Sequence, residues 1–500
     1  MSLPKLLSIA MCFTLLVACS DNNNNSPEPT VPAEPEFLPI AVPTVSNPPD
    51  AGEPFLQANA FDLADVGYEQ QEYFLDGTAT AFANTNEFLN DGLWQAEPGE
   101  QAEYKTRILV HRPVDPVAFN GSVLVEWLNV TAGFETPPSW GTGHVEMYRQ
   151  GHIWIGVSVQ LVGIEGRPGS LAPLHLKNVN PDRYGSLVHP GDSFSYDMFS
   201  QVSAVLREPA PIDVLNGMVA DRVVAYGESQ SASRLVTYIN AVQLLYNAYD
   251  GFMVHSRGAG SAPLAQEPQV EIPTPDAPRI RTDINVPVMT FETETDVTLL
   301  GYVAARQEDT DSFRLWEVAG TSHADRYTIV AGRLDAVGEP QYAAVVEEDT
   351  VFGFLKCDNP FNSGPMHYVF NTAIRQLDQW VLNGTLPTEA PRLELNDDQS
   401  DYLKDINGNA IGGIRTPYVD APVAILAGDG QSGESFCFLF GTTFLFTPEQ
   451  MASLYVDEAG YVAAVATAAV NAVAEGFLLQ VDADAINAWA PEQWRFQSEL

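Results

Sequence analysis

One serine stands in a sequence context that could make it a nucleophile. A run rich in β-branched residues, Arg222–Tyr226, leads directly into the segment Gly227-Glu228-Ser229-Gln230-Ser231, and helical periodicity follows over 231–245. A tight turn from strand to helix exposes its central side chain and requires small residues two positions before and two positions after it. Both positions meet this requirement, although the second holds a serine where glycine is usual. The pattern predicts that Ser229 can attack an acyl carbon.

A histidine is needed to take the proton of such a serine. The chain has eight histidines, and only His323 and His367 lie beyond the strand that is expected to supply an acid. His323 directly follows the predicted strand Phe313–Val318, whereas His367 begins a predicted helix. We therefore predict that His323 is the general base.

Three carboxylates at the end of another predicted strand, Val286–Glu292, could orient this histidine. The strand ends in the segment Glu292-Thr293-Glu294-Thr295-Asp296. Alternate residues of an extended segment lie on the same side, so spacing alone does not choose among the three. A position in the turn a few residues beyond the strand favours Asp296, with Glu294 as the alternative acid.

Attack by the serine would leave negative charge on the carbonyl oxygen, which backbone amides can stabilise. One such amide is that of Gln230, at the start of the helix predicted after the nucleophile. A second is expected from the loop Asn129–Gly133, which follows the predicted strand Ser122–Leu128. Asn129 and Val130 are the candidates within this loop, and the sequence does not decide between them.

Short buried strands alternate with segments of helix length through most of the chain. This alternation is typical of a parallel sheet with helices on its faces, and it places each candidate residue on a loop after a strand. Helices are also predicted over 366–382 and over an alanine-rich segment, 461–475. The remaining predicted strands are Tyr104–His111, Ile153–Val159 and Gly251–Ser256.

Together these motifs make the chain resemble a bacterial branch of the α/β-hydrolase superfamily. The resemblance extends over residues 40–500 and implies an α/β-hydrolase fold, a mostly parallel sheet flanked by helices, with little indication of the substrate. It also implies a serine-hydrolase mechanism with the chain order serine, acid, histidine. The matching segments are Val125-Glu126-Trp127-Leu128-Asn129-Val130, Arg183-Tyr184-Gly185-Ser186-Leu187, His189-Pro190-Gly191-Asp192, the segment around Ser229, Glu292–Asp296, Trp316–His323 and Gly412-Gly413-Ile414-Arg415-Thr416-Pro417.

The expected activity is cleavage of carboxylic esters through an acyl-enzyme. An acyltransferase or a peptidase could use the same three residues. A surface protein that keeps the fold and binds without chemistry is the alternative from another class. The substrate is expected to be a small-molecule or polymer ester.

The N-terminus is typical of a bacterial lipoprotein signal. The apolar segment Leu6–Ala18 is too short to span a bilayer and ends in Leu16-Val17-Ala18-Cys19, which resembles a lipobox. The resemblance implies cleavage before Cys19 and acylation of that residue, so lipid would be the only contact with the membrane. Ser20 then favours the outer membrane, facing the periplasm or the exterior.

Export leaves an even pair of cysteines in the mature chain, Cys357 and Cys437. We predict a disulfide between them, because disulfides persist in oxidising compartments, with two free buried thiols as the alternative. The expected organisation is a signal peptide (1–18), a disordered Asn/Pro/Glu tether (19–50), an α/β-hydrolase core (51–391) and a C-terminal extension packed on the core (392–500).

The composition is strongly acidic. The 500 residues include 65 Asp and Glu against 24 Lys and Arg, a formal net charge of −41. Such a surface repels phosphate backbones, so we expect no nucleic-acid partner. The sequence contains no phosphate-binding glycine loop, dinucleotide fingerprint or zinc-type cysteine spacing, so we expect no cofactor and no metal. The oligomeric state is not indicated.

Overall fold

A nine-stranded β-sheet forms the centre of the computed structural model, which describes residues 37–500 apart from 57, 209–210, 352, 354 and 499–500. The strand order is β1-β2-β3-β5-β4-β6-β7-β8-β9. The pairs from β5 to β9 are parallel, and those from β1 to β5 are antiparallel. The strands are β1 (Thr44–Ser46), β2 (Tyr68–Asn84), β3 (Ala96–Pro113), β4 (Ser122–Trp127), β5 (Ile153–Val157), β6 (Arg222–Glu228), β7 (Gly251–His255), β8 (Val288–Thr293) and β9 (Phe313–Val318).

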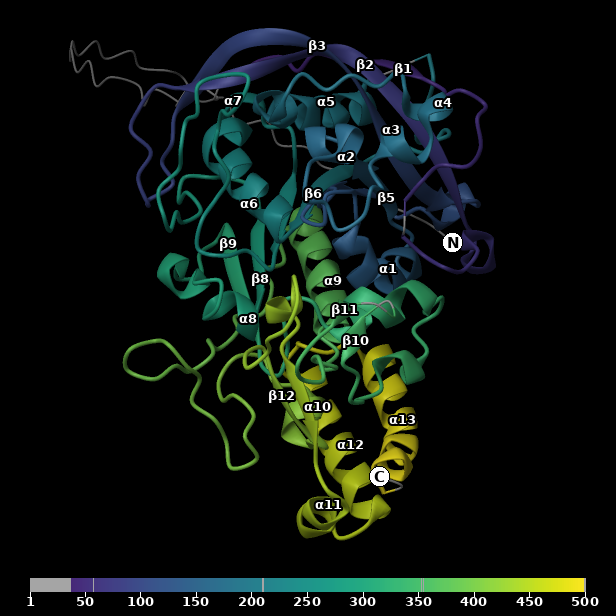
Figure 1. The fold of residues 1–500 in the computed structure, drawn as a ribbon, viewed down its shortest axis with the longest axis vertical. Coiled ribbons are helices and arrows are strands. Elements are labelled where there is room, and N and C mark those ends of the chain that lie inside the picture. Colours follow the sequence, from purple (N-terminus) through teal and green to yellow (C-terminus); the bar gives the residue numbers. More distant parts are fainter. Residues whose placement is uncertain (1–36, 57, 209–210, 352, 354, 499–500) are drawn as a thin grey trace, which may run out of the picture. The chain divides into compact units, whose positions relative to one another are not determined.

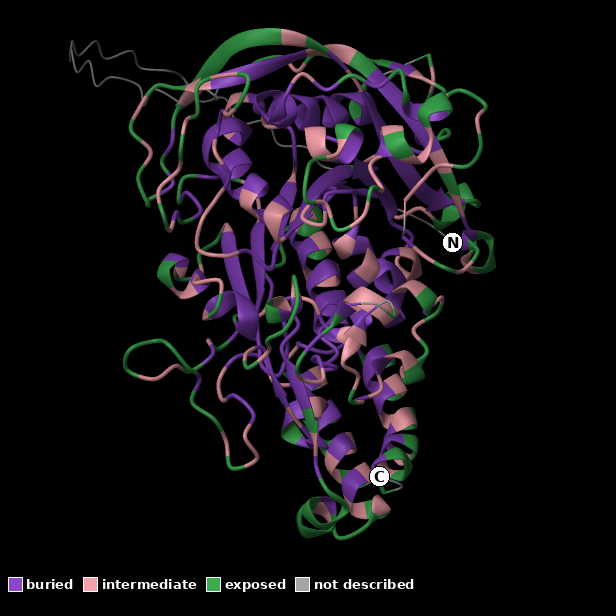
Figure 2. Ribbon diagram, in the orientation of Figure 1, coloured by how far each residue is buried: buried purple, intermediate pink, exposed green. Residues whose placement is uncertain are grey.

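The predicted fold class is confirmed, and each predicted strand overlaps an observed one. Strands β4 to β9 are buried along their whole length (Figure 2), as expected for parallel strands covered on both faces. Strand β2 was not predicted, and β3 was predicted only in its second half, because its first half is mostly exposed and polar. Strand β5 also separates β3 from β4, although β4 follows β3 in the chain.

The expected tether ends earlier than residue 50. Thr44–Ser46 form strand β1, which pairs with residues 74–76 of β2, and the Val45 side chain is buried in the core. One apolar side chain between prolines was too weak a pattern to indicate a strand. The expected signal peptide, Cys19 and the tether up to residue 36 lie outside the described residues.

Helices cover both faces of the sheet (Figure 1), and strand alternation decides which side chains meet which helices. Val123 and Val125 of β4 share one core cluster with α5 and α6, whereas Leu124 shares another with α1 and α9. The helices are α1 (Pro138–Arg149), α2 (Leu161–Glu165), α3 (Leu176–Val179), α4 (Pro181–Tyr184), α5 (Ser195–Arg207), α6 (Gln230–Thr237), α7 (Gln243–Tyr246), α8 (Glu294–Val297), α9 (His367–Asn383), α10 (Pro417–Asp420), α11 (Pro448–Tyr455), α12 (Glu458–Ala474) and α13 (Gln480–Ser498). A π-helical segment, Tyr238–Val242, joins α6 to α7 within the single helix that was predicted.

The C-terminal part packs on the sheet as expected and belongs to the same compact unit, Phe37–Leu500. Ile414 forms a parallel β-bridge with Val318, at the end of β9. Helices α11, α12 and α13 form a separate core cluster together with β12 (Ala424–Ala427), and Tyr418 of α10 packs against it. Strand β12 pairs with β13 (Thr442–Leu445). Strands β10 (Thr350–Val351) and β11 (Leu355–Lys356) form a small antiparallel pair. Among the described residues, no helix is both long and apolar enough to cross a bilayer.

Candidate active site

Ser229 occupies the sharp turn between β6 and α6. Its backbone has φ 56° and ψ −118°, a conformation that non-glycine residues rarely adopt and that costs about 1–3 kcal/mol. Gly227 allows the turn, because a Cβ there would lie 2.9 Å from the Ser231 carbonyl oxygen. Ser231 is completely buried, so a small residue is required at this position too. The predicted turn and its size limits are therefore present.

His323 lies within hydrogen-bonding distance of both the serine and one carboxylate. Its Nε2 is 2.9 Å from the Ser229 Oγ, and its Nδ1 is 2.6 Å from an Asp296 oxygen. The three residues follow β6, β8 and β9, whose carboxyl ends meet at the same edge of the parallel sheet. The sheet thus brings together three residues spread over almost a hundred positions, and each was predicted from its place after a strand.

Asp296 is oriented by the residue before α8. The backbone amide and the hydroxyl of Thr293 donate hydrogen bonds of 2.7 and 2.6 Å to one oxygen of Asp296. The other oxygen is therefore directed at the His323 Nδ1 and favours the tautomer with a proton there. In that tautomer Nε2 is free to accept the serine proton.

The alternative acid, Glu294, does not contact the histidine. Its carboxylate instead accepts hydrogen bonds from the backbone amides of Gly320 and Gly428, at 2.6 and 2.8 Å. Glu292 is also fully buried, and burial raises its pKa well above the usual range. Asp296 is thus the one carboxylate of the three that is hydrogen-bonded to His323, because the short helix α8 ends the extended alternation that had left the choice open.

The electrostatics of the site suit a general base. Burial lowers the pKa of His323, but the charge of Asp296, its hydrogen bond and the nearby Glu228 raise it by more, so the net shift is upward. A histidine with a raised pKa takes a proton more readily from a neighbouring hydroxyl.

The structure distinguishes the candidate oxyanion donors. The Asn129 amide already donates to the Thr136 carbonyl at 3.0 Å, so this predicted donor is excluded because its hydrogen is engaged. The Thr131 amide is likewise bonded, to the Asn129 side chain at 2.8 Å. The Val130 amide has no acceptor among the described residues. The Gln230 amide opens α6, where helix geometry supplies no acceptor, so Gln230 and Val130 remain candidates.

A mostly apolar pocket of about 490 Å³ opens over Ser229 and His323. One wall comes from the loop after β4 and includes Phe134. Another comes from distant parts of the chain, Val351, Leu355, Phe436, Leu439 and Phe440. The C-terminal segment therefore forms part of the pocket wall, a role that the sequence could not reveal.

The predicted disulfide between Cys357 and Cys437 is present and lies behind this wall. Both cysteines are buried in one apolar cluster with Val351, Leu355 and Phe440. The covalent link joins the segment around β11 to the segment before β13. It thereby fixes two parts of the pocket wall that are 80 residues apart in sequence.

Glu228 is a further site residue that sequence reasoning did not single out. It lines the pocket, and its Oε1 lies 3.5 Å from the His323 Nε2 while Oε2 accepts a hydrogen bond from the Asn129 side chain. Burial, opposed by His323 and reinforced by Asp296, raises the pKa of Glu228 to about 8. Its position directly before Ser229 was visible in the sequence, but the direction of its side chain was not.

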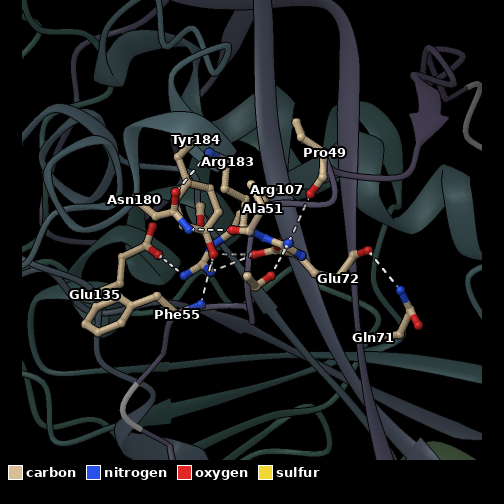
Figure 3. Close-up of polar contacts among 12 residues, drawn as sticks. Pro49, Ala51, Phe55, Gln71, Glu72, Arg107, Glu135, Asn180, Arg183 and Tyr184 are labelled. Carbon is tan, nitrogen blue, oxygen red and sulfur yellow. Dashed lines mark hydrogen bonds and ion pairs between the residues drawn. The ribbon is translucent and has the colours of Figure 1, made fainter.

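A buried ion-pair network holds the loop that carries Val130 (Figure 3). Arg107 of β3 binds Glu135 of this loop at 2.6 Å and Glu72 of β2 at 2.8 Å. Arg183 of α4 binds the other oxygen of Glu72, and the Tyr184 hydroxyl also donates to Glu72. The loop is therefore fixed to the antiparallel part of the sheet by charges that lie almost completely out of water.

The sequence profile described as "Alpha/beta hydrolase domain" matches residues 39–488, so the chain belongs to this family. No curated protein sequence matches it significantly.

Several solved structures match parts of this chain at low identity and low TM-score. A glucuronoyl esterase from Solibacter usitatus is 11% identical over 56% of this chain and 82% of its own, with a TM-score of 0.27. A putative acetyl xylan esterase from Bacteroides fragilis is 11% identical over 56% and 70%, with a TM-score of 0.27. A putative dienelactone hydrolase from Klebsiella pneumoniae is 12% identical over 49% and 85%, with a TM-score of 0.24.

Proposed function

We propose that the chain is a serine hydrolase that cleaves carboxylic esters through Ser229, His323 and Asp296. The observation that carries the proposal is the hydrogen-bonded series from the Ser229 hydroxyl through His323 to Asp296, at the floor of a pocket. Membership of the alpha/beta hydrolase family supports the same chemistry. The mostly apolar lining suits a substrate whose acyl or alcohol part is apolar.

The reaction follows from the positions of these groups. Ser229 Oγ attacks the ester carbon while His323 Nε2 takes its proton, and Asp296 stabilises the resulting imidazolium. The amides of Gln230 and Val130 donate to the oxyanion. His323 then protonates the leaving alkoxide, which departs as an alcohol and leaves an acyl group on the serine. Water, deprotonated by His323, attacks the acyl-enzyme and releases the acid.

Ester hydrolysis by Ser229→Ala and Ser231→Ala tests this proposal. Ser231 stands two positions away in the same turn and is buried, so it controls for disturbance of the elbow. Ser229→Ala is expected to lose at least about 10³-fold in kcat, because only binding and the oxyanion donors would remain. Ser231→Ala is expected to keep most of the activity. Equal activity of Ser229→Ala and the wild type would refute the mechanism.

We further propose that the protein is an exported lipoprotein acylated at Cys19 and held at the outer membrane. The disulfide between Cys357 and Cys437 supports an oxidising compartment. Metabolic labelling with palmitate should mark the wild type and Cys12→Ser but not Cys19→Ser, since Cys12 leaves with the signal peptide. Labelling of Cys19→Ser would contradict this assignment.

A further inference from the structure

One arginine, Arg333, lines the pocket that contains Ser229 and His323. It lies in a short 3₁₀ segment, Gly332–Leu334, and its carbonyl accepts a hydrogen bond of 2.7 Å from the Ala60 amide. The preceding Gly332 packs closely on the Gly141 carbonyl, where a Cβ would lie at 2.7 Å. The backbone that presents Arg333 to the pocket is therefore held firmly from two sides.

Arg333 has no carboxylate partner among the described residues, which is unusual in this chain. Acidic residues outnumber basic ones 65 to 24, and each described lysine and most described arginines form an ion pair. The described arginines without an ion pair are Arg167, Arg257, Arg279 and Arg333.

The other arginines in this group differ from Arg333. Arg257 is buried and donates to the carbonyls of Ala259 and Pro278, and Arg279 is exposed away from the pocket. Arg167 donates to the carbonyl of Thr131. Arg333 alone of them belongs to the pocket lining.

The side chain of Arg333 also carries a buried donor without an acceptor. Its Nε is shielded from solvent and has no hydrogen-bond partner among the described residues. A buried N–H left without an acceptor costs about 1–3 kcal/mol, so native proteins usually satisfy it with a protein group, a water or a ligand. The two terminal nitrogens of Arg333, unlike Nε, are not enclosed, and they too have no acceptor among the described residues. Their edge of the planar guanidinium matches the two oxygens of a carboxylate.

We propose that Arg333 binds a carboxylate on the substrate, separate from the ester that Ser229 attacks. The substrate class is then an ester on a largely apolar skeleton that also carries one negative charge. This inference rests on the proposed function, because it concerns the same pocket.

The remaining charges around the pocket agree with an anionic substrate. Glu228 is the one acidic residue among the described residues that line it. Burial raises the pKa of Glu228 to about 8, so this carboxyl repels an anion less than an ordinary glutamate would. Arg167 adds positive charge beside Thr131, which also lines the pocket. In a protein of net charge −41, this local arrangement would offset the repulsion that an anion meets elsewhere.

Two pairs of esters test the proposal without assuming which side of the substrate faces Arg333. In the first pair the charge is on the acyl side: 4-nitrophenyl hydrogen glutarate against 4-nitrophenyl methyl glutarate. In the second it is on the alcohol side: 4-acetoxybenzoate against methyl 4-acetoxybenzoate. Release of the phenol gives kcat and KM for the wild type and for Arg333→Gln, Arg333→Lys and Arg279→Gln. The exposed Arg279, unpaired but absent from the pocket lining, controls for a general change of surface charge.

In at least one pair, Arg333→Gln should lower kcat/KM for the carboxylate ester by about ten- to a hundredfold, mainly through KM. The neutral ester should change by less than about threefold, and Arg279→Gln should affect neither. Arg333→Lys should lie between the wild type and Arg333→Gln, since it keeps the charge and loses the fork. The Arg333→Lys variant also keeps a positive charge at this position, so it can still be compared with the wild type if Arg333→Gln does not fold. Equal changes for the charged and neutral members of both pairs would overturn the proposal.

This experiment separates failure of the inference from failure of the proposed function. Cleavage of the neutral esters without any role for Arg333 would leave the hydrolase intact and refute carboxylate binding. If none of the four esters is cleaved, calorimetric titration of monomethyl glutarate and 4-hydroxybenzoate decides the inference. Binding of either compound to the wild type, with at least tenfold weaker binding to Arg333→Gln, would support the inference. If neither compound binds to the wild type, the inference is overturned.

Discussion

At the scale of single residues, the contact between Asp296 and His323 depends on two hydrogen bonds from Thr293. They turn one oxygen of Asp296 toward His323, while Glu294, two positions earlier, is bound by the amides of Gly320 and Gly428. Period-two alternation had placed both carboxylates on the same side. The difference arises because the chain leaves the strand conformation at Glu294 and enters α8, which side-chain periodicity could not show.

Exchange of the two carboxylates for amides distinguishes their roles. Asp296→Asn should lower kcat by about 10³- to 10⁴-fold, since an amide stabilises the wrong histidine tautomer and no longer supports its cation. Glu294→Gln should retain most of the activity and lose thermal stability, because the amide of Gly320 or Gly428 would then face an NH₂ group instead of a carboxylate oxygen. Steady-state kinetics and thermal melts of both variants check this. The assignment fails if Glu294→Gln is the variant that loses activity.

Glu228 predicts a dependence of stability on pH. Burial raises its pKa from the ordinary value of 4.5 to about 8, so the folded protein binds this proton more tightly than the unfolded chain does. The free energy of unfolding contributed by Glu228 is therefore fully present below about pH 4.5 and is lost as the pH rises toward 8.

The Glu228→Gln variant has no titrating group at this position, so its free energy of unfolding does not fall in this way as the pH rises. Relative to the wild type, the variant should gain stability between pH 5 and pH 8.5. Denaturant unfolding of both proteins at the two pH values measures the change. A constant difference across this range would show that Glu228 is ionised in the folded protein throughout.

At the scale of elements, the parallel strands were predictable because both of their faces are covered, which leaves continuous apolar runs in the sequence. Strand β2 and the first half of β3 were missed, since both are partly exposed to water and lack such continuous runs. His323 and Asp296 could be proposed as base and acid because each lies in a segment that follows a strand. Asn129 was a wrong candidate for the oxyanion, because its amide pairs with Thr136 in a bridge that the sequence does not indicate. Arg333 was not predictable, since no local pattern links its segment to the pocket.

The buried network around Arg107 should contribute strongly to stability. Arg107→Met leaves the carboxylates of Glu72 and Glu135 without their shared partner and is expected to lower the free energy of unfolding by about 3–5 kcal/mol. Lys105→Met, two residues away on β3, removes only a partly exposed ion pair with Asp76 and should cost less than about 1 kcal/mol. Denaturant unfolding compares the two variants. Similar losses would contradict a special role for the network.

The disulfide should matter for substrate binding as well as for stability. Replacement of Cys357 and Cys437 together by serine removes the link behind the wall formed by Val351, Leu355 and Phe440. We expect a loss of about 2–4 kcal/mol in the free energy of unfolding and a several-fold rise in KM at an unchanged kcat. A lower kcat without any change in KM would show that the disulfide supports Ser229 and His323 rather than the pocket wall.

At the scale of the whole molecule, the C-terminal part is integrated with the site. Gly428 donates to Glu294, the Tyr402 hydroxyl donates to the Glu294 carbonyl, and Ile414 extends the hydrogen bonding of β9. Phe436 and Phe440 also line the pocket. The expected boundary at residue 391 therefore separates elements that depend on one another, although the prediction that they pack together is confirmed.

Deletion of residues 392–500 is accordingly expected to prevent folding. The truncated chain would expose the core cluster around β9 and leave the buried Glu294 carboxylate short of one of its two donors. Solubility and near-ultraviolet circular dichroism of the fragment, beside the full chain, measure this. A soluble fragment with native spectra and esterase activity would establish the C-terminal part as a dispensable appendage.

Covalent labelling with a fluorophosphonate probe, followed by peptide mapping, tests most directly whether Ser229 is the activated nucleophile. The probe reacts with a serine whose proton is taken by a neighbouring base, and it requires no knowledge of the natural substrate. We expect one modified residue, Ser229, with labelling abolished in Ser229→Ala and strongly slowed in His323→Ala. Labelling at another serine, or none on the folded wild-type protein, would contradict this assignment.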